Sequence, residues 1–249
     1  MSESTHDFLR KLPLGRDVTL LNHDRHGLAA YSKPAGVLSH PNIPQEESRS
    51  LLTCPYSIDD ECFQWTDSKG KVHKIWLLNR LDSATSGVIL VCVNEELADI
   101  IRLHFRQKRV CKIYNALVFG HAHPTKQVWR DRLVVQRKGG QIRTSSRGNI
   151  PSECKMRVLK QGTVHALLEL EPTTGRSHQL RVQCNKRHFP IVGDATYGDF
   201  SRNRSFAKEQ GSKRLFLHSL ETSFEYTYKG KRNRFKATAP LPDGFGIPA

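Results

Sequence analysis

Alternating apolar and polar residues mark several stretches of this 249-residue chain as half-buried β-strands. The first stretch is 112–119, and the second is 164–171, with Val164, Ala166, Leu168 and Leu170 on one face. The third contains Phe224, Tyr226 and Tyr228. A turn at 229–231 follows it and leads to a partner strand near Phe235. The continuous apolar run at 88–93 predicts a buried strand. Residues 28–31, and 62–65 joined to 74–77 by a turn at 67–70, predict three more strands.

Helical spacing follows the apolar run. Leu97, Ile101 and Phe105 recur every four residues, and Asn94 is suited to cap the N-terminus of that helix. The cations at 106–109 lie at its negative end, where they are either solvated or in contact with a phosphate.

A second helix is predicted to begin with Ser177 as its N-cap and to turn Leu180 and Cys184 inward. Many strands and few helices favour an α+β fold, with a mixed, largely antiparallel sheet flanked by helices. We expect residues 1–27 to form an irregular lead and residues 28–249 to form one domain, because no linker divides them.

The charge of the chain narrows the choice of partner. Lys and Arg total 39 against 24 Asp and Glu, a net charge of +15. Such an excess indicates a phosphate polymer or an anionic membrane, unless the surface is basic but inert. The longest clean apolar run, 87–93, is far short of the roughly 20 residues that span a bilayer, and residues 1–10 lack the apolar core of a signal peptide. We therefore expect a cytoplasmic protein that binds nucleic acid and no membrane.

Cysteine and histidine give no sign of a metal. The six cysteines form no Cys-x-x-Cys pair, so reduced thiols are expected. His121 and His123 form a close pair, but Gly120 and Pro124 flank them and no carboxylate is adjacent, which favours a solvated turn.

One carboxylate has an unusual setting. Asp82 lies in a polar turn over 79–87, directly before the buried strand and two residues after Arg80. Such a turn holds an acid rigidly at the edge of a sheet. Taken alone, the spacing favours a turn-capping Asp over a catalytic one.

Two distant segments also carry candidate chemistry. The strand at 112–118 includes Tyr114, whose ring matters for chemistry only if it lies against a flat ligand such as a base. The segment 174–183 places five polar donors within six residues: Arg176, Ser177, His178, Gln179 and Arg181. A compact Gly- and Pro-containing turn follows at 190–198. The sequence has no Walker-type phosphate loop and no dinucleotide fingerprint.

Together these segments resemble the RluA family of RNA pseudouridine synthases. The family motifs stand in order at 32–37 (the Lys-Pro-x-Gly turn), 80–87 (Arg-Leu-Asp-x-x-Thr-Ser-Gly), 112–118 (Lys-x-Tyr-x-Ala-Leu-Val), 175–182 (Gly-Arg-x-His-Gln-Leu-Arg-Val), 190–198 (Pro-Ile-x-Gly-Asp-x-x-Tyr-Gly) and 215–218 (Leu-x-Leu-His). The resemblance runs from about residue 28 to residue 240. Any one motif is weak, but six in order are strongly specific.

The resemblance implies a catalytic domain with a central RNA-binding cleft. It implies an isomerase that converts a specific uridine to pseudouridine in structured ribosomal or transfer RNA. That reaction involves no redox change and no net loss of a proton, so no cofactor and no metal are expected. We also expect a monomer whose catalytic domain binds RNA by itself, because residues 1–27 leave no room for the small N-terminal RNA-binding module of some members.

The resemblance also assigns roles to residues. Asp82 is the implied catalytic carboxylate, acting on a uridine flipped out of the RNA stack; whether it attacks the sugar, adds to the base or removes a sugar proton stays open. Arg181 matches the basic partner that would lower the pKa of Asp82. Tyr114 matches the tyrosine that packs on the uracil and is a candidate proton acceptor. Arg80 is implied to fill the vacated space or to hold a phosphate.

Further basic and polar residues complete the expected RNA-binding set. Phosphate contacts of this kind position an RNA but do not specify its sequence. The set is Lys112, Arg176, His178 and Gln179 within the motifs, and Arg137, Lys138 and Arg143 around a hairpin-like turn in the basic segment 130–147; a second basic segment is 229–236.

Two positions depart from the family pattern. Asn79 and Gln183 stand where most members have His. Asn79 keeps open the alternative of a catalytically silent RNA-binding protein on the same fold, although the presence of Asp82, Tyr114 and Arg181 argues against it. A metal-dependent nuclease is disfavoured, because Asp82 has no second carboxylate at short spacing.

Overall fold

The computed structural model describes residues 5–138 and 141–246, without the side chains at positions 137, 138, 141, 142 and 147. The chain forms two compact units. The first consists of residues 1–111 and 221–240, and the second of residues 112–220 and 241–249.

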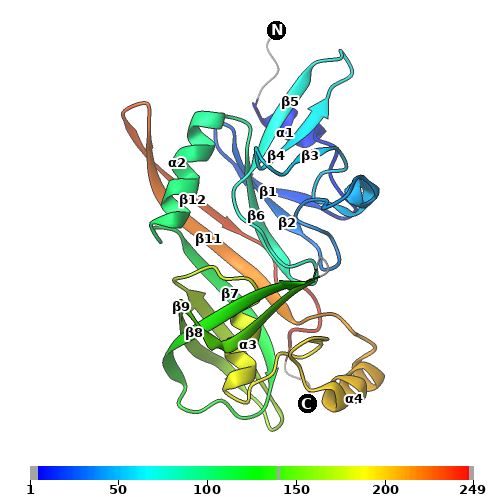
Figure 1. Cartoon of the computed structure of the whole chain (residues 1–249), viewed down its shortest axis with the longest axis vertical. Helices are drawn as coiled ribbons and strands as arrows, with labels where there is room; N and C mark the ends of the chain where they lie inside the picture. The colour runs from blue at the N-terminus through cyan, green and yellow to red at the C-terminus, as the bar shows by residue number, and fades with distance from the viewer. Residues whose placement is uncertain (1–4, 139–140, 247–249) are drawn as a thin grey trace. The chain divides into compact units, whose positions relative to one another are not determined.

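The first unit is rich in strands and carries one long helix, α2 (Figure 1). β2 pairs with β1 and β6, β5 pairs with β4 and β6, and β11 pairs with β12, each time antiparallel. The elements are α1 (Thr5–Lys11), β1 (Thr19–His23), β2 (Leu28–Lys33), η1 (Pro44–Arg49), β3 (Tyr56–Ser57), β4 (Cys62–Thr66), β5 (Val72–Leu77), β6 (Ser86–Cys92), α2 (Glu95–Arg106), most of β11 (Leu217–Tyr228) and β12 (Lys231–Thr238).

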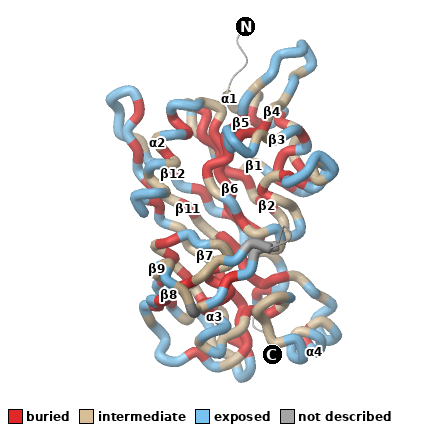
Figure 2. The backbone as a smooth tube through the Cα atoms, viewed as in Figure 1, coloured by how far each residue is buried: buried red, intermediate tan, exposed pale blue. Residues whose placement is uncertain are grey.

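The core of the first unit forms around β6. Every residue of this strand is buried, as its continuous apolar run predicts, and Figure 2 shows the strand in red. α2 begins where the Asn94 side chain accepts a hydrogen bond of 3.0 Å from the N–H of Leu97, so the predicted cap is confirmed. Leu97 and Ile101 then pack into the same core as Phe224 and Tyr226 of β11.

The second unit contains the remaining strands and two helices. Its antiparallel strand order is β7–β10–β9–β8. The elements are β7 (Cys111–Phe119), β8 (Lys126–Lys138), β9 (Gln141–Gln161), β10 (His165–Pro172), α3 (Gln179–Lys186), α4 (Phe200–Gln210) and the start of β11. β8 and β9 form a long hairpin, and an added Cβ at Gly148 would lie 2.2 Å from the Leu133 carbonyl group, so the two backbones approach closely there. These units confirm the predicted α+β fold with a largely antiparallel sheet.

Residues 5–27 are more regular than the irregular lead that we expected. Thr5–Lys11 form α1, whose Leu9 is fully buried and accepts a hydrogen bond of 2.9 Å from the Tyr31 hydroxyl. Thr19–His23 form β1 along the edge of β2. Burial of Leu9, Leu12 and Val18 and the pairing of β1 with β2 hold this segment in place. The domain limit at residue 28 stays a prediction.

Two finer expectations were wrong. Ser177 does not cap α3; the cap position is His178, in the left-handed conformation with φ 53° and without a side-chain cap bond. Val164 precedes β10 and is 56% exposed, whereas Ala166, Leu168 and Leu170 are buried on one face as predicted.

All six cysteines are free thiols. Within residues 5–138 and 141–246, no helix is both long enough and apolar enough to cross a bilayer.

Candidate active site

The turn that carries Asp82 is tied to a neighbouring segment of the first unit. The Ser39 hydroxyl donates to the Leu81 carbonyl oxygen at 2.7 Å and accepts from the Leu81 N–H at 2.9 Å. Within the turn, the Thr85 N–H donates to the Asp82 carbonyl oxygen at 3.0 Å. Asp82 is half-buried and Arg80 is exposed. The backbone on both sides of the carboxylate is thus fixed by hydrogen bonds.

A buried lysine strengthens this attachment. Lys33 has no exposed surface, and its Nζ donates to the carbonyl oxygens of Pro34, Val37 and Ser83 at 3.0, 2.7 and 3.1 Å. The Ser83 carbonyl oxygen also accepts the Gly36 N–H at 2.8 Å. Since Ser83 follows Asp82, the Lys-Pro-x-Gly turn holds the carboxylate turn in place. The spacing of this motif in the sequence does not by itself reveal the role of Lys33.

Asn79 has a structural role at the start of the same turn. Its Oδ1 accepts a hydrogen bond of 2.8 Å from the N–H of Leu90 in β6. This bond anchors the turn to the buried strand. The departure from the family's usual His therefore preserves an acceptor at this position.

In the second unit, Arg181 forms a two-point ion pair with Asp194. The Arg181 Nε and an η-nitrogen each lie 2.8 Å from the Asp194 carboxylate, and both residues are buried. Burial alone would raise the pKa of Asp194, but hydrogen bonds and charge from Arg181, with the N–H groups of Tyr197 and Thr196, hold it below its usual value. The Arg181 guanidinium also lies over the Tyr197 ring, 5.0 Å from its centre. Asp194 belongs to the 190–198 turn, where the sequence pattern alone gives no sign of its pairing with Arg181.

Tyr197 connects three parts of the second unit. Its hydroxyl lies 2.8 Å from His178 Nδ1 and accepts the Thr144 N–H at 2.9 Å. The Thr144 hydroxyl in turn donates to the Ser177 carbonyl oxygen at 2.9 Å. This set of contacts fixes His178 at the start of α3, and it takes the place of the side-chain cap that Ser177 was expected to supply.

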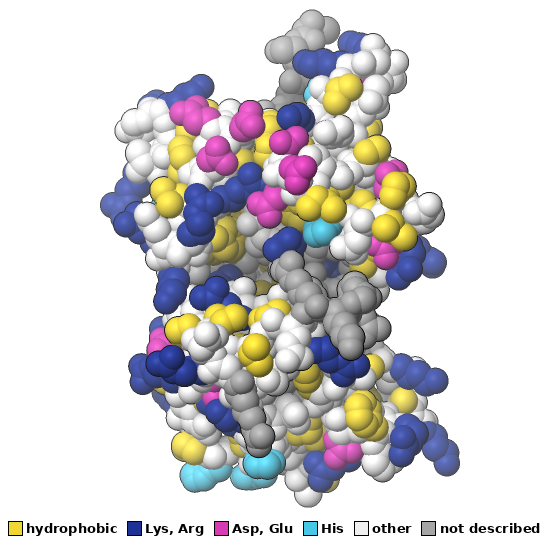
Figure 3. All heavy atoms as spheres, in the orientation of Figure 1, with side chains coloured by type: hydrophobic (Ala, Val, Ile, Leu, Met, Phe, Trp, Pro, Cys, Tyr) yellow, Lys and Arg dark blue, Asp and Glu magenta, His cyan; other side chains and the backbone are white. Residues whose placement is uncertain are grey.

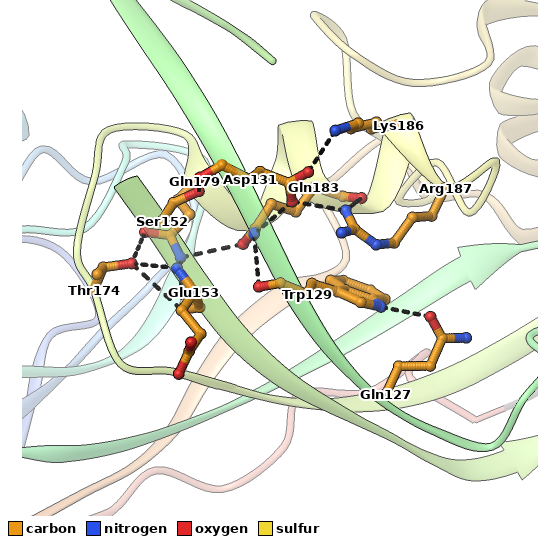
Figure 4. A network of polar contacts seen from close by, with 10 residues as sticks. All are labelled: Gln127, Trp129, Asp131, Ser152, Glu153, Thr174, Gln179, Gln183, Lys186 and Arg187. Atoms are coloured by element: carbon orange, nitrogen blue, oxygen red, sulfur yellow. Dashed lines mark hydrogen bonds and ion pairs between the residues drawn. The ribbon is translucent and has the colours of Figure 1, made fainter. Parts of the chain in front are cut away.

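Gln179 and Gln183 lie in a buried polar network that Figure 4 shows. The Thr174 hydroxyl donates to Gln179 Oε1 at 2.7 Å, and Gln179 Nε2 donates to Gln183 Oε1 at 3.1 Å. Gln179 Nε2 also donates to the Glu153 carbonyl oxygen. Because the Gln179 amide is buried and hydrogen-bonded inside the unit, we do not expect it to contact RNA directly.

Asp131 is the centre of this network. It accepts Gln183 Nε2 at 2.8 Å, Lys186 Nζ at 2.6 Å and an Arg187 η-nitrogen at 2.8 Å (Figure 4). Burial would raise the pKa of Asp131, but these three donors lower it below the usual value. The Arg187 guanidinium also lies 4.8 Å from the centre of the Trp129 ring. The carboxylate thus fastens α3 to β8, and Gln183, at the second family departure, is one of its donors.

The other predicted site residues lie on the two units as follows. Tyr114 is half-buried on β7 and pairs with Leu170 of β10. Lys112 Nζ donates to the Thr174 carbonyl oxygen at 3.4 Å, and Arg176 is exposed. Arg143 is exposed on β9, whereas the side chains of Arg137 and Lys138 lie outside the described part of the chain. Asp82 and Arg80 therefore belong to the first unit, and all the other described site residues belong to the second.

No three His, Cys, Asp or Glu side chains of the described ranges are grouped so that they could hold a metal ion. The polar groups brought together are instead suited to binding anions and flat rings: guanidinium groups, amides and tyrosine rings.

Comparisons with known proteins show the family of this chain. A family model described as RNA pseudouridylate synthase matches residues 27–186. A ribosomal large subunit pseudouridine synthase C of Vibrio cholerae is 32% identical over 66% of this chain and 51% of its own length. A tRNA pseudouridine synthase C of Pasteurella multocida is 31% identical over 80% of this chain and 82% of its own length. The chain thus spans about half of the first relative and about four fifths of the second.

Solved structures show the same fold. The human RNA pseudouridylate synthase domain containing 1 has a TM-score of 0.65 and 23% identity, covering 90% of this chain and 83% of its own. The human RNA pseudouridylate synthase domain containing 4 has a TM-score of 0.65 and 22% identity, covering 97% of this chain and 92% of its own. The matched region 27–186 contains Asp82, Tyr114 and Arg181 in their motifs. The chain belongs to the RNA pseudouridylate synthase family, and its motifs identify it as a member of the RluA type.

Proposed function

We propose that this protein is an RNA pseudouridine synthase that isomerises a specific uridine in structured RNA, either ribosomal or transfer RNA. The observation that carries the proposal is the family match across 27–186, which contains all three candidate catalytic residues. Relatives named for ribosomal RNA and for transfer RNA both match, so either RNA class is retained. The net charge of +15 suits a polyanionic substrate.

The reaction defines what the chain must supply. The bond between the sugar carbon C1′ and the uracil nitrogen N1 breaks, the uracil turns, and C1′ bonds to the uracil carbon C5. The proton of C5 leaves and N1 gains one, so the product is an isomer of the substrate. These steps require an ionised carboxylate, an orienting cation and a proton acceptor, and they balance without a redox partner.

Asp82 is the carboxylate in this proposal, and Arg181 is its orienting cation. A guanidinium carries five N–H donors, so one arginine is able to bind two carboxylates. Asp194 then acts as a positioning residue, because it fixes the plane of the guanidinium. Tyr114 is placed against the uracil and takes up the C5 proton.

The uridine has to leave the RNA stack to reach these groups, which costs a few kcal/mol. Arg80, exposed and two residues from Asp82, is proposed to occupy the vacated space. Phosphate contacts from Lys112, Arg176, His178, Arg143, Arg137 and Lys138 are proposed to position the RNA. Gln179 is left out of this set because its amide is buried.

The test is to map pseudouridine in the RNA of cells with and without the gene, and then to restore wild-type protein, Asp82→Ala or Asp59→Ala. Asp59 is an exposed aspartate of the same unit and serves as the matched control. The proposal expects at least one uridine to lose its modification on deletion, and to regain it with wild type and Asp59→Ala but not with Asp82→Ala. If deletion changes no uridine, the enzymatic proposal fails; if Asp82→Ala restores the modification, only the role of Asp82 fails.

A further inference from the structure

Two basic segments that are far apart in the sequence line one pocket of the first unit. The last turn of α2 meets β11 and β12, whose aromatic residues share a core with that helix (Figure 1). The pocket is lined by His104, Arg109, Glu225, Tyr226, Thr227 and Arg232. None of these residues belongs to the six family motifs.

The surface around the pocket is mainly positively charged. Figure 3 shows Lys and Arg side chains gathered over the C-terminal part of α2 and the adjoining strands. Glu225 pairs with Arg232 and Glu221 pairs with Lys236, so two of the cations are partly neutralised by neighbours. The exposed cations are Arg106 at the end of α2, Lys108 and Arg109 after it, and Lys229, Lys231, Arg232, Arg234 and Lys236 on the hairpin. The excess of positive charge favours a polyanion.

The pocket also contains a polar atom that the described chain leaves unpaired. His104 Nδ1 is buried and has no hydrogen-bond partner among the described residues. Burial, and then the charge of Arg109, lowers the pKa of His104. Thr227 adds an exposed hydroxyl to the same pocket. That hydroxyl can donate a hydrogen bond to an anionic oxygen.

The negative end of a helix normally repels an anion. Here the last carbonyl groups of α2 are already paired, because the N–H groups of Gln107, Lys108 and Arg109 donate to the carbonyl oxygens of Leu103, Phe105 and His104. Lys108 adopts φ 59°, which folds the chain back over the helix end. The cations that follow the helix are therefore not needed to pair with these carbonyl groups.

We propose that the pocket between the end of α2 and the β11–β12 hairpin binds a phosphodiester group of the RNA backbone, at a position outside the family motifs. Arg109 supplies the charge, together with Arg232, whose guanidinium also pairs with Glu225, and Thr227 supplies a neutral donor. The inference rests on the proposed function only in taking RNA as the substrate. Since a phosphate contact carries no sequence information, the pocket serves every RNA that the protein binds.

The test measures binding and needs no turnover. A fluorescent RNA hairpin of arbitrary sequence is titrated with protein over a series of salt concentrations. Wild type is compared with Arg109→Gln/Arg232→Gln and with a control that loses the same charge elsewhere, Arg16→Gln/Lys69→Gln. Arg16 and Lys69 are exposed residues of the same unit outside the pocket. Each lost phosphate contact should reduce the slope of log Kd against log salt by about 0.7–0.9.

The proposal expects a slope reduced by about 0.7–0.9 in the pocket variant, because one phosphodiester contact is lost, and close to the wild-type slope in the control. Equal slopes for the two variants would overturn it. If the double variant unfolds, Arg109→Gln alone carries the test: Arg109 is exposed, and a reduced slope is again expected. Failure of the proposed function shows differently, as normal RNA binding by wild type without any pseudouridine formed.

Discussion

Arg181 and Asp194 hold each other through two nitrogen–oxygen contacts of 2.8 Å inside the second unit. Arg181 comes from α3 and Asp194 from the 190–198 turn, so the pair joins two family motifs. A two-point ion pair fixes both the position and the plane of a guanidinium. This relationship makes Asp194 a positioning residue for the proposed catalytic arginine.

Asp194→Asn should destabilise the protein and slow the proposed reaction. The substitution leaves a buried guanidinium without its carboxylate, a change that costs about 3–5 kcal/mol. The measurements are denaturant unfolding and single-turnover pseudouridine formation. Asp243→Asn, an exposed position of the second unit, is the control and should match wild type. Unchanged stability of Asp194→Asn would contradict the importance of the pair.

The same pair predicts a loss of stability in acid. The pKa of Asp194 is lower in the folded protein than its usual value of 3.8. Its contribution to stability is therefore complete above that usual value and is lost as pH falls through the lower folded value. Wild-type unfolding free energy, measured by urea titration from neutral pH downward, should fall below about pH 4 more steeply than that of Asp194→Asn. Parallel curves for the two proteins would assign the acid loss to other carboxylates.

Gln183 should be replaceable by the residue that the family uses, but not by an apolar one. Gln183→Leu removes a donor from buried Asp131 and an acceptor from Gln179, at a cost of about 1–3 kcal/mol. Gln183→His keeps one donor and one acceptor on the ring and should retain most of the stability. Thermal unfolding of the two variants side by side decides this. A His variant as unstable as the Leu variant would argue against hydrogen bonding as the role of Gln183.

Lys33→Met should impair both folding and turnover. The variant leaves three carbonyl oxygens without the cationic donor that buried Lys33 supplies, which we expect to cost about 3 kcal/mol. Loss of the bond to Ser83 also loosens the turn beside Asp82, and a displacement of about 1 Å can reduce turnover about 10²-fold. Lys71→Met, at an exposed position of the same unit, is the matched control. The measurements are unfolding free energy and single-turnover rate at saturating RNA; a Lys33→Met protein with a wild-type rate would show that Lys33 does not position Asp82.

RNA affinity of the wild-type protein should fall steeply as salt rises. The excess of 15 positive charges implies many phosphate contacts, and about six or more of them would weaken binding by about 10³-fold or more between low and physiological salt. Fluorescence anisotropy with an RNA hairpin measures this directly. A flat response would contradict binding through the phosphate backbone.

The pattern of apolar and polar residues predicted those elements that depend only on residues close together in the chain. The apolar run of β6, the Asn94 cap of α2 and the alternation of β10 depend on periodicity and on neighbours along the chain, so they could be predicted. The start of α3 could not, because contacts made by Tyr197, many residues later, hold His178 there. The helix and strand within residues 5–27 also depend on partners further along the chain, such as Tyr31 for Leu9.

Some residues of the candidate site could likewise be predicted from the sequence, and others could not. The motifs around Asp82, Tyr114 and Arg181 can be read from the chain, because a family keeps residue types at fixed spacing. Trp129, Asp131 and Leu133 alternate along β8 and are all buried. This alternation indicates that Asp131 faces inward, but the surrounding basic residues suggest an exposed segment. Its donors come from α3, more than 50 residues away in the chain.

The sequence by itself determined the family, the strand-rich fold and the identity of the candidate catalytic residues. Only the tertiary structure decided which groups hold them: Lys33 for the Asp82 turn, Asp194 for Arg181, and Asp131 with Gln183 for α3. The physical reason is that a buried charge is stable only with partners at hydrogen-bond distance. Folding brings those partners from segments that are far apart in the sequence, and their spacing does not predict the contact.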